Sequence, residues 1–408
     1  MSDASRPGDR PAPQLAYARW TDALARAGWR TAPVTEQVPA AEGLGRVTAA
    51  PVHARGSLPR SDCAAMDGIA VAAAAVAGIG GDRVVLPPGA FTWIDTGDPV
   101  PPGTDTVIER ERVVPRDDGG VEITGGAATP GRNVRAAAED FAAGDMLVPA
   151  GWRLRPADLA AAAAGGHVTL AVARQPVVAI IPTGDEIRPV GAALGRGDIT
   201  DTNSLMLAAR CRQAGARPAV SAVQPDDPDA LAAEIRRSAA SADLVLVIAG
   251  SSRGRGDHTA VVLAQVGGVA VAGAAVRPGH PVLLGHAKPG DGSDGIVPVV
   301  GVPGYPLAAA VTCELFALPL LAAAGGWRHA PDTRPAVLDR DWTSPPSVEE
   351  WVPVQLTRSA DRVMATPARR GAGSVSQLAR AGAWWPIPAG DGTFPAGTTI
   401  EVRPIPGA

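Results

Sequence analysis

Three stretches decide the fold of this 408-residue chain: QPVVAIIPTGDE (residues 175–186), ADLVLVIAGSSRGRGD (242–257) and GIVPVVGVPGYP (295–306). Each begins with a continuous apolar run, which is typical of a strand buried on both faces of a parallel sheet, and then enters a short polar loop. Helical segments alternate with these strands at 204–214, 228–240, 258–265 and 306–323. The alternation predicts a doubly wound α/β domain over residues 176–326, with all three loops at the ligand-binding edge of its sheet.

The rest of the chain predicts a multidomain protein, with β-rich parts beside the α/β domain. Residues 1–47 form a polar tail and an amphipathic helix, and we expect residues 150–175 to join them in space as a linker. Residues 48–149 show short strands between Pro and Gly turns, which predicts a β-rich inserted domain. Short strands resume over residues 327–408 and predict a small β-barrel.

Composition excludes several classes of function. A net charge of −4 gives no reason to expect nucleic acid as a partner. The N-terminus lacks the apolar core of a secretory signal, and no uninterrupted apolar run reaches the roughly 18–20 residues of a membrane helix. Cys63, Cys211 and Cys313 are far apart, which indicates buried thiols in a reducing compartment. We therefore expect a cytoplasmic protein that does not use a membrane.

The first loop places two carboxylates directly after a strand. It reads Thr183, Gly184, Asp185, Glu186. Carboxylates at this position suit a hard cation such as Mg²⁺, or the orientation of a water molecule. The alternative is a helix start, with Asp185 as N-cap and Glu186 as its capping partner.

The second loop interleaves glycines, hydroxyls, arginines and one acid. Its candidate ligand-binding residues are Gly250, Ser251, Ser252, Arg253 and Asp257. A loop with a purely structural role rarely needs this mixture, whereas a phosphate or oxyanion cradle does.

Two further segments provide candidate binding residues. Pro303 and Gly304 follow the third strand, and Arg277 and His280 follow another apolar run. Each segment also suits a structural turn, since Pro306 fits the first position of a helix. Phosphate-binding loops together with paired carboxylates imply Mg²⁺ bridging the protein and a nucleotide-like ligand.

Several motifs point to one family. They are LPRSDCAAMDGIAV (58–71), IDTGDPVP (94–101), NVR (133–135) with ED (139–140), PTGDEI (182–187), DTN (201–203) and VPG (302–304). In order and spacing they resemble the molybdopterin molybdenumtransferases, the MoeA type that also forms the C-terminal part of gephyrin. The resemblance extends from about residue 15 to residue 405.

The resemblance implies the last step of molybdenum cofactor biosynthesis. Adenylylated molybdopterin and molybdate, as co-substrates, would give the metal-loaded cofactor and AMP with Mg²⁺. It also implies that the α/β domain binds molybdopterin, that the protein is a homodimer, and that the molybdopterin adenylyltransferase is a candidate partner.

Residue roles follow from the same resemblance. Asp67, Thr96 and Asp140 would line one side of the cleft, as catalytic residues together with Glu186 and Asp257. Asp67 has an alternative role in an Asx-turn before a strand. Mg²⁺ would be held by Asp185, Glu186 and Asp257. Substrate would be bound by Thr183, Gly184, Asp185, Gly250, Ser251, Ser252, Arg253, Arg277, His280, Pro303, Gly304 and Ser374. Asp227 also aligns with a family acid, but Asp227-Pro228 is a better helix cap.

The chain also departs from the family pattern. Arg277 and His280 stand where the family has lysines, and Tyr305 replaces its usual Asn. Arg277 keeps a fixed positive charge, whereas a histidine is only partly protonated near neutral pH. Arg369 and Arg370 precede the Ser374 element and suit either anion steering or a solvated turn. The alternative function is therefore a non-catalytic paralogue that acts as a molybdopterin or molybdate carrier, a sensor or a scaffold.

Overall fold

The computed structural model describes residues 10–30, 32–76, 83–125, 128–249, 258–359, 362–371, 373–390 and 392–407. The chain forms two compact units. The large unit comprises Met1–Val34 and Ala173–Ala408, and the small unit comprises Thr35–Val172. The finer division into five segments stays a prediction.

A six-stranded sheet forms the centre of the large unit. Its order is β16 (Arg217–Val220), β13 (Val177–Pro182), β17 (Leu244–Ala249), β21 (Val297–Pro303), β20 (Leu283–Ala287) and β18 (Gly267–Ala272). The first four strands are parallel, whereas β20 is antiparallel to both β21 and β18. The doubly wound α/β prediction is confirmed, with an antiparallel edge that it did not include. No crossover helix lies between β20 and β21, so the chain returns antiparallel.

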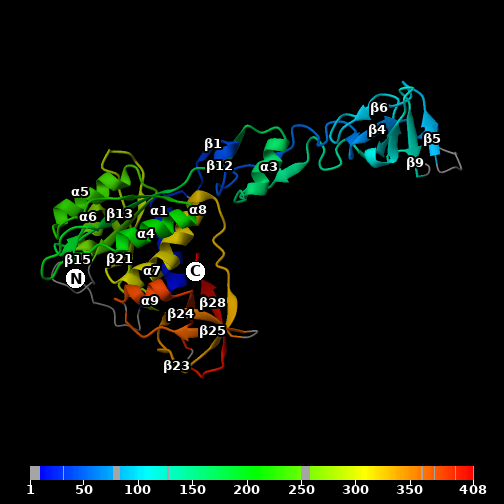
Figure 1. Cartoon of the computed structure of the whole chain (residues 1–408). Helices are drawn as coiled ribbons and strands as arrows, with labels where there is room; N and C mark the ends of the chain where they lie inside the picture. The colour runs from blue at the N-terminus through cyan, green and yellow to red at the C-terminus, as the bar shows by residue number, and fades with distance from the viewer. Residues whose placement is uncertain are drawn as a thin grey trace. The chain divides into compact units, whose positions relative to one another are not determined.

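Helices cover both faces of this sheet (Figure 1). One face carries α1 (Pro13–Arg26), α4 (Asn203–Ala214), α7 (Pro306–Thr312), η4 (Cys313–Ala317) and α8 (Leu318–Gly325), and the other carries α5 (Pro228–Ala239) and α6 (Thr259–Val266). Along β17, Leu244 and Leu246 belong to the first core, and Val245 and Val247 to the second. Each side chain leaves water completely, which stabilises the fold by about 1.5–3 kcal/mol per residue.

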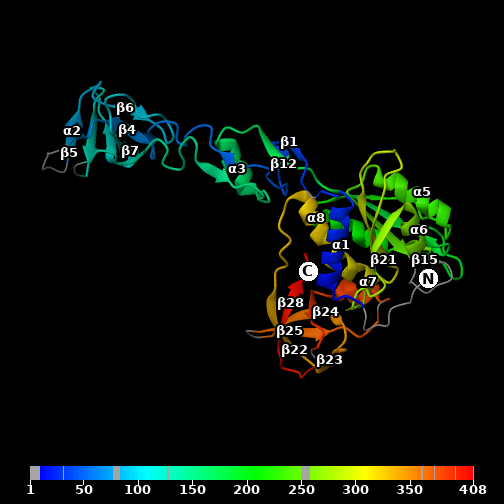
Figure 2. The ribbon, with the colours of Figure 1, turned by 180° about the vertical axis from the view of Figure 1, so that it is seen from behind.

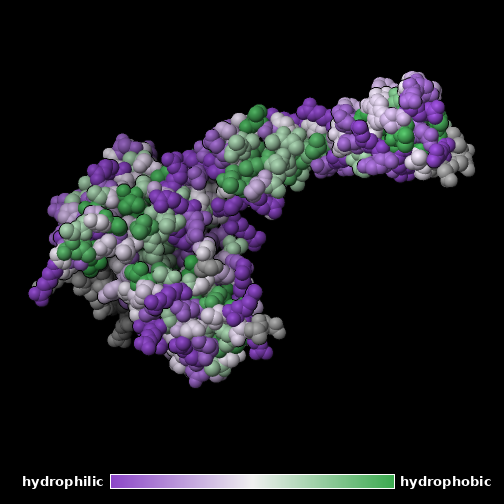
Figure 3. All heavy atoms as spheres, viewed as in Figure 1, coloured by the Kyte–Doolittle hydropathy of each residue, from purple (hydrophilic) through white to green (hydrophobic). Residues whose placement is uncertain are grey.

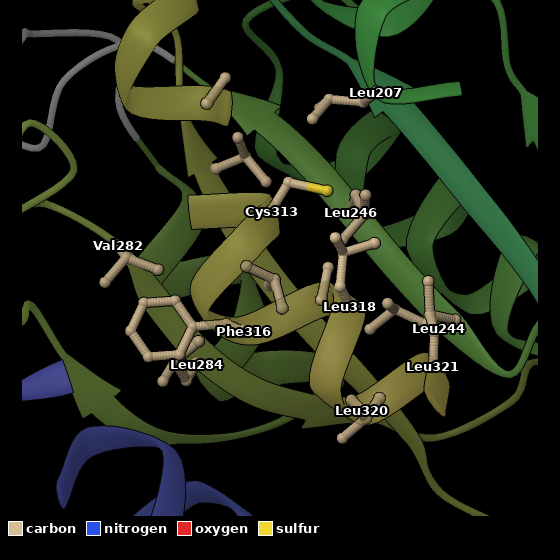
Figure 4. Close-up of a cluster of buried hydrophobic side chains, with 14 of the residues drawn as sticks. Leu207, Leu244, Leu246, Val282, Leu284, Cys313, Phe316, Leu318, Leu320 and Leu321 are labelled. Atoms are coloured by element: carbon tan, nitrogen blue, oxygen red, sulfur yellow. The ribbon is translucent and has the colours of Figure 1, made fainter. Parts of the chain in front are cut away.

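The helical stretch Pro306–Gly325 fills the first core. Among the described residues it alone is long and apolar enough to cross a membrane, but 67% of its apolar window is buried inside the protein. Phe316, Leu320 and Leu321 are fully buried in the core (Figure 4). Glu314 interrupts the apolar run and pairs with Arg210 at 2.6 Å. The stretch is therefore a core helix of the large unit.

The N-terminal helix α1 belongs to the large unit and not with residues 150–175. Its stripe of Ala16, Trp20 and Leu24 is fully buried in the first core, where α1 contacts β18 and β20. Figure 2 shows α1 within the large unit. The Trp20 indole N–H donates to the carbonyl of Gly285 at 2.8 Å. The grouping of 1–47 with 150–175 is thus incorrect for this helix, because its apolar stripe is buried against the sheet and η4 of the large unit.

A closed β-barrel completes the large unit. Its strands are β22 (Arg334–Leu338), β24 (Glu349–Ser359), β25 (Arg362–Pro367), β26 (Ala383–Ile387) and β28 (Thr399–Pro404). The ring closes because β26 pairs with both β24 and β28. The predicted barrel is confirmed, although the sequence analysis did not identify β26. One further strand, β19 (Val276–Arg277), runs parallel to β24 and joins the α/β part to the barrel.

Short elements complete the large unit. They are the pairs β14 (Ile187–Arg188) with β15 (Ile199–Thr200) and β23 (Trp342–Thr343) with β27 (Thr393–Phe394), and helix α9 (Val375–Arg380).

The small unit is rich in short strands, as predicted. Its described residues form two three-stranded sheets. The strand order of one is β6 (Thr92–Ile94), β4 (Gly68–Val71) and β7 (Thr106–Glu109). The strand order of the other is β5 (Arg83–Leu86), β9 (Val121–Thr124) and β8 (Val113–Pro115). Paired strands are β1 (Thr35–Pro39) with β12 (Thr169–Ala173), β2 (Val52–His53) with β11 (Met146–Val148) and β3 (Cys63–Ala64) with β10 (Val134–Arg135). Helical elements are η2 (Ala40–Glu42), α2 (Ala73–Val76), η3 (Arg110–Arg112) and α3 (Pro156–Ala164).

Replacing Trp20 tests the attachment of α1. Trp20→Ala should lower the free energy of unfolding by about 3–5 kcal/mol, because it leaves a cavity and removes the hydrogen bond to the Gly285 carbonyl. Leu15→Ala, on the exposed side of the same helix, should change it by less than about 0.5 kcal/mol. Urea unfolding measures both, and equal effects would contradict the packing of α1.

Candidate functional site

In the small unit, Asp67 and Thr96 form one hydrogen-bonded pair. Both the backbone N–H and the hydroxyl of Thr96 donate to Oδ1 of Asp67, at 2.7 and 2.6 Å. This contact joins residues 29 positions apart, so it replaces the Asx-turn that the sequence left open. The two bonds from Thr96 hold the pKa of Asp67 below its ordinary value, and the charge of Arg110 lowers it further. Asp67 is therefore an exposed carboxylate held in its ionised form.

The backbone explains why glycine follows Asp67. Gly68 pairs with Ile94 on one side and Glu109 on the other. A Cβ atom at Gly68 would lie 1.8 Å from the carbonyl oxygen of Ile108, which no side chain tolerates. Glycine lets the neighbouring strand approach and so fixes the carboxylate of the preceding residue.

Asp140 is also in the small unit, but its contacts differ from those of Asp67 and Thr96. Its N–H donates to the carbonyl of Leu58, nine positions before Asp67, and it borders a cavity of about 760 Å³ beside α3. Hydrophobic residues gather on the surface over α3 (Figure 3). The structure thus brings Thr96 to Asp67, whereas Asp140 contributes to a different hollow of the small unit.

In the large unit, the first loop lies at the carboxyl ends of the parallel strands. The N–H and hydroxyl of Thr183 both donate to the carbonyl of Ile248, at 3.0 and 2.9 Å. Gly184 has φ of +131°, a conformation that other residues rarely adopt, and its N–H donates to Gln224. Thr183 and Gly184 therefore hold the loop through backbone contacts and turn its two acids outward.

The two acids do not cap a helix. The N–H of Asp226 donates to Oδ1 of Asp185 at 3.2 Å, and that of Asp185 donates to Asp226 at 3.5 Å. Glu186 is exposed, and its carbonyl accepts from Ile199. The sequence analysis missed Asp226, although its neighbour Asp227 was correctly read as the cap of α5, where it accepts from Asp229 and Ala230. The only signal was a second acid before Pro228 that capping does not require.

Several predicted residues are outside the described part of the chain. They are Gly250, Ser251, Ser252, Arg253 and Asp257. Among the residues that are described, no group of three or more His, Cys, Asp or Glu side chains is arranged to hold a metal ion. Carboxylates of Asp185, Glu186 and Asp226 nevertheless have the oxygen donors that Mg²⁺ prefers, so the donor chemistry of this edge fits the ion.

A groove of about 410 Å³ lies where the α/β part meets the barrel. Three predicted residues, Arg277, His280 and Pro303, border it, together with Tyr305, which directly precedes α7. Arg277 is exposed and makes no ion pair with any described residue. The groove therefore combines a cation available to an anionic ligand with an apolar and aromatic wall.

The two adjacent arginines of the groove have different roles. Arg370 donates to both carboxylate oxygens of Glu350, at 3.1 and 3.3 Å, and lies over the Trp342 ring at 4.5 Å. The Trp342 indole also donates to Glu350, which is only 3% exposed. Arg370 is thus neutralised by a buried acid and supports the wall, whereas Arg369 is exposed at the groove.

Gly304 and Ser374 occupy structural positions near this groove. The side chain of Asn203 donates to the carbonyl of Gly304 at 2.6 Å, which ties α4 to the turn after β21. Ser374 immediately precedes α9, and its hydroxyl contacts that of Ser376 at 3.3 Å. Neither residue lines the groove itself. Asn203 is a positioning residue that the sequence analysis did not single out for this role.

Family profiles match consecutive parts of this protein over almost the whole chain. Profiles of the MoeA N-terminal region (domain I and II), a probable molybdopterin binding domain and the MoeA C-terminal region (domain IV) match residues 18–166, 179–323 and 335–405. The chain belongs to the MoeA family. The resemblance and the enzyme class predicted from the sequence are therefore confirmed.

Individual members of the MoeA family align along almost the full chain. Molybdopterin molybdenumtransferase 2 of Mycobacterium tuberculosis is 32% identical over 410 residues, covering 91% of this chain and 94% of its own. The molybdopterin molybdenumtransferase of Bacillus subtilis is 27% identical, covering 90% and 89%. The crystal structure of a molybdopterin biosynthesis MoeA protein from Pyrococcus horikoshii superposes with a TM-score of 0.82 at 29% identity, covering 98% and 100%.

Removing the Thr96 hydroxyl should raise the pKa of Asp67. Thr96→Val deletes the donor that lowers this pKa most, so protonation of Asp67 should begin at higher pH as the solution is acidified. Carboxyl carbon NMR titration measures the change. Thr104→Val, which removes a hydroxyl bonded to Pro101, should leave Asp67 unaffected. An unchanged Asp67 titration in Thr96→Val would contradict the assignment.

Replacing each of the two groove arginines by Ala should lower the free energy of unfolding by different amounts. Arg370→Ala leaves Glu350 buried without its cation and should lower the free energy of unfolding by about 2–4 kcal/mol. Arg369→Ala should cost less than about 0.5 kcal/mol, because its side chain is exposed. Similar losses in urea unfolding would show that Arg370 does not support the groove.

Proposed function

We propose that this protein inserts molybdenum from molybdate into adenylylated molybdopterin, with Mg²⁺ bound and with release of AMP. The observation that carries the proposal is the sheet edge: Asp185 and Asp226 lie at the end of β13, and the groove with Arg277 lies at the end of β21. Only β17 separates these strands, so the strands themselves are on the order of 10 Å apart. Relatives that share this fold are named molybdopterin molybdenumtransferases.

In this proposal, one set of residues binds the nucleotide end of the substrate and another binds Mg²⁺. Thr183, Gly184 and Asp185 hold the nucleotide end of the substrate together with Gly250, Ser251, Ser252 and Arg253. Asp185, Glu186 and Asp257 hold Mg²⁺, which offsets negative charge on the pyrophosphate when bound, and Asp226 lies beside Asp185. Water then breaks the P–O–P bond, so that one phosphate stays with molybdopterin and AMP leaves.

The groove residues recognise the oxyanion in the same proposal. Arg277 offers a fixed positive charge and two parallel donors, and His280 adds an imidazole at the border of the groove. Pro303, Gly304 and Ser374 shape the turns around the groove, while Asp67, Thr96 and Asp140 complete the catalytic set. A homodimer located in the cytoplasm is the expected active form, with the molybdopterin adenylyltransferase as a candidate supplier of substrate.

The direct test follows both products in one reaction. Purified protein is incubated with adenylylated molybdopterin, Mg²⁺ and either molybdate or tungstate, and AMP release and metal retained on the pterin are measured together. We expect both to appear in equal amounts, with a preference for one oxyanion. Tight substrate binding without AMP would overturn the transferase and establish the carrier.

A variant of Arg277 locates the oxyanion within this reaction. Arg277→Ala should raise the molybdate concentration for half-maximal rate about 10- to 100-fold, since a bond to a charged group is lost, and should change the nucleotide requirement little. Arg217→Ala, an exposed arginine on β16, is the matched control. A larger effect on the nucleotide requirement would place Arg277 on the nucleotide side.

A further inference from the structure

An exposed tryptophan lies beside Asp67 in the small unit. Trp93 on β6 is 46% exposed, although its ring packs edge-on against Phe91 at 6.0 Å. It pairs directly with Ile69, two positions after Asp67, and directly paired residues of antiparallel strands point to the same face. The indole is therefore carried by the strand next to the one that Asp67 precedes.

Arg110 connects the tryptophan with the carboxylate. Its N–H donates to the carbonyl of Asp67 at 2.9 Å, and its guanidinium lies over the Trp93 ring at 5.7 Å. Its charge also acts on Asp67. Within the described part of the chain, no carboxylate is within 4.0 Å of this guanidinium. The cation is thus held over the ring by geometry and remains available to a ligand.

The other exposed tryptophan of the small unit shows what a closed arrangement looks like. Trp152 is 40% exposed and has Arg155 over its ring at 5.1 Å. There Asp158 pairs with Arg155 at 2.9 Å and accepts from the Trp152 indole at 3.0 Å. No described acceptor takes the indole N–H of Trp93 in this way. Asp158 thus pairs with both Arg155 and the Trp152 indole N–H, whereas no described carboxylate pairs with Arg110 or with the Trp93 indole N–H.

The hydrogen bonds of Asp67 also leave one oxygen available. Both bonds from Thr96 go to Oδ1, and none of the described residues donates to Oδ2. Trp93 therefore offers the face of its ring that Arg110 does not cover, Asp67 an acceptor, and Arg110 a donor with positive charge. Such a set suits a planar heterocycle that stacks on the indole and presents donors at one edge.

The substrate of the proposed function contains two planar heterocycles, and their edges differ. The pterin edge presents an amino group and a ring N–H, which are both donors, whereas the adenine edge pairs its amino group with an acceptor nitrogen. A carboxylate accepts from the first edge and repels the acceptor of the second. We propose that Trp93, Arg110 and Asp67 form the subsite for the pterin ring of the substrate, an inference that rests on the proposed function.

Steady-state kinetics test the subsite through Trp93. Trp93→Ala should raise KM for adenylylated molybdopterin roughly tenfold, because stacking on one aromatic side chain is lost. kcat should stay within about twofold, since the ring is held equally in the ground state and the transition state. Trp93→Phe should keep most of the affinity, and Trp152→Ala, the matched control, should leave KM unchanged. A fall in kcat at constant KM would overturn the subsite.

Equilibrium binding separates the subsite from the reaction. Binding of adenylylated molybdopterin without molybdate or Mg²⁺ is followed by pterin fluorescence, with neopterin and AMP as competitors. Neopterin should compete about tenfold less well for Trp93→Ala than for the wild type, and AMP equally well for both. If the wild type binds in this Trp93-dependent way but never releases AMP, the proposed function fails and the subsite stands.

Other outcomes of the binding test would overturn the subsite. They are a folded Trp93→Ala protein with unchanged affinity, a loss of AMP competition in place of neopterin competition, and absence of neopterin competition in the wild type. Thermal unfolding establishes that each variant is folded. If Trp93→Ala does not fold, Trp93→Phe and Arg110→Gln provide the comparison, and unchanged neopterin competition in Arg110→Gln would overturn the role of Arg110.

Discussion

Burial of the parallel strands on both faces is the constraint on which the rest of the large unit depends. Every residue of β17 is buried, and its side chains alternate between two separate cores. A strand in this position has no surface for polar groups, so hydroxyls, acids and glycines collect where the strands end. The first loop and the groove lie at the same edge of the sheet for this reason, although Arg277 comes 91 residues after Glu186 in the sequence.

Strong local patterns made much of this fold predictable. Helices α4, α5 and α6 are close to their predicted positions, because periodicity, proline and capping signals all agree there. The missed elements depend on distant partners. Strand β26 is a short run, AWWPI, whose identity as a strand comes from pairing with β24 and β28. Likewise, the apolar stripe of α1 shows that it must be covered, but not by which sheet.

The residues of the candidate site also differ in this respect: local sequence patterns mark some of them, and only distant partners in the fold reveal the others. Asp67, Thr96, Asp185 and Arg277 were found through motifs that extend over a few neighbouring residues. Asp226 was missed because one of two adjacent acids already explained the helix cap, and only the fold shows which of them faces Asp185. Glu350 was missed because nothing local distinguishes a buried acid from an exposed one until Arg370, twenty residues later, folds onto it. Residues Gly250 and Asp257 belong to a loop outside the described part of the chain, so their roles remain with the proposal.

The short strand β19 has a consequence for how this protein can be divided. Val276 and Arg277 leave the α/β sheet and pair with Glu349 and Glu350 of the barrel. The exposed cation of the groove therefore belongs to the α/β part by sequence and to the barrel by backbone pairing. A chimera that exchanges barrels between relatives at residue 327 would separate Arg277 from the strand that positions it. The modular unit that can be transplanted intact is the barrel together with this two-residue strand.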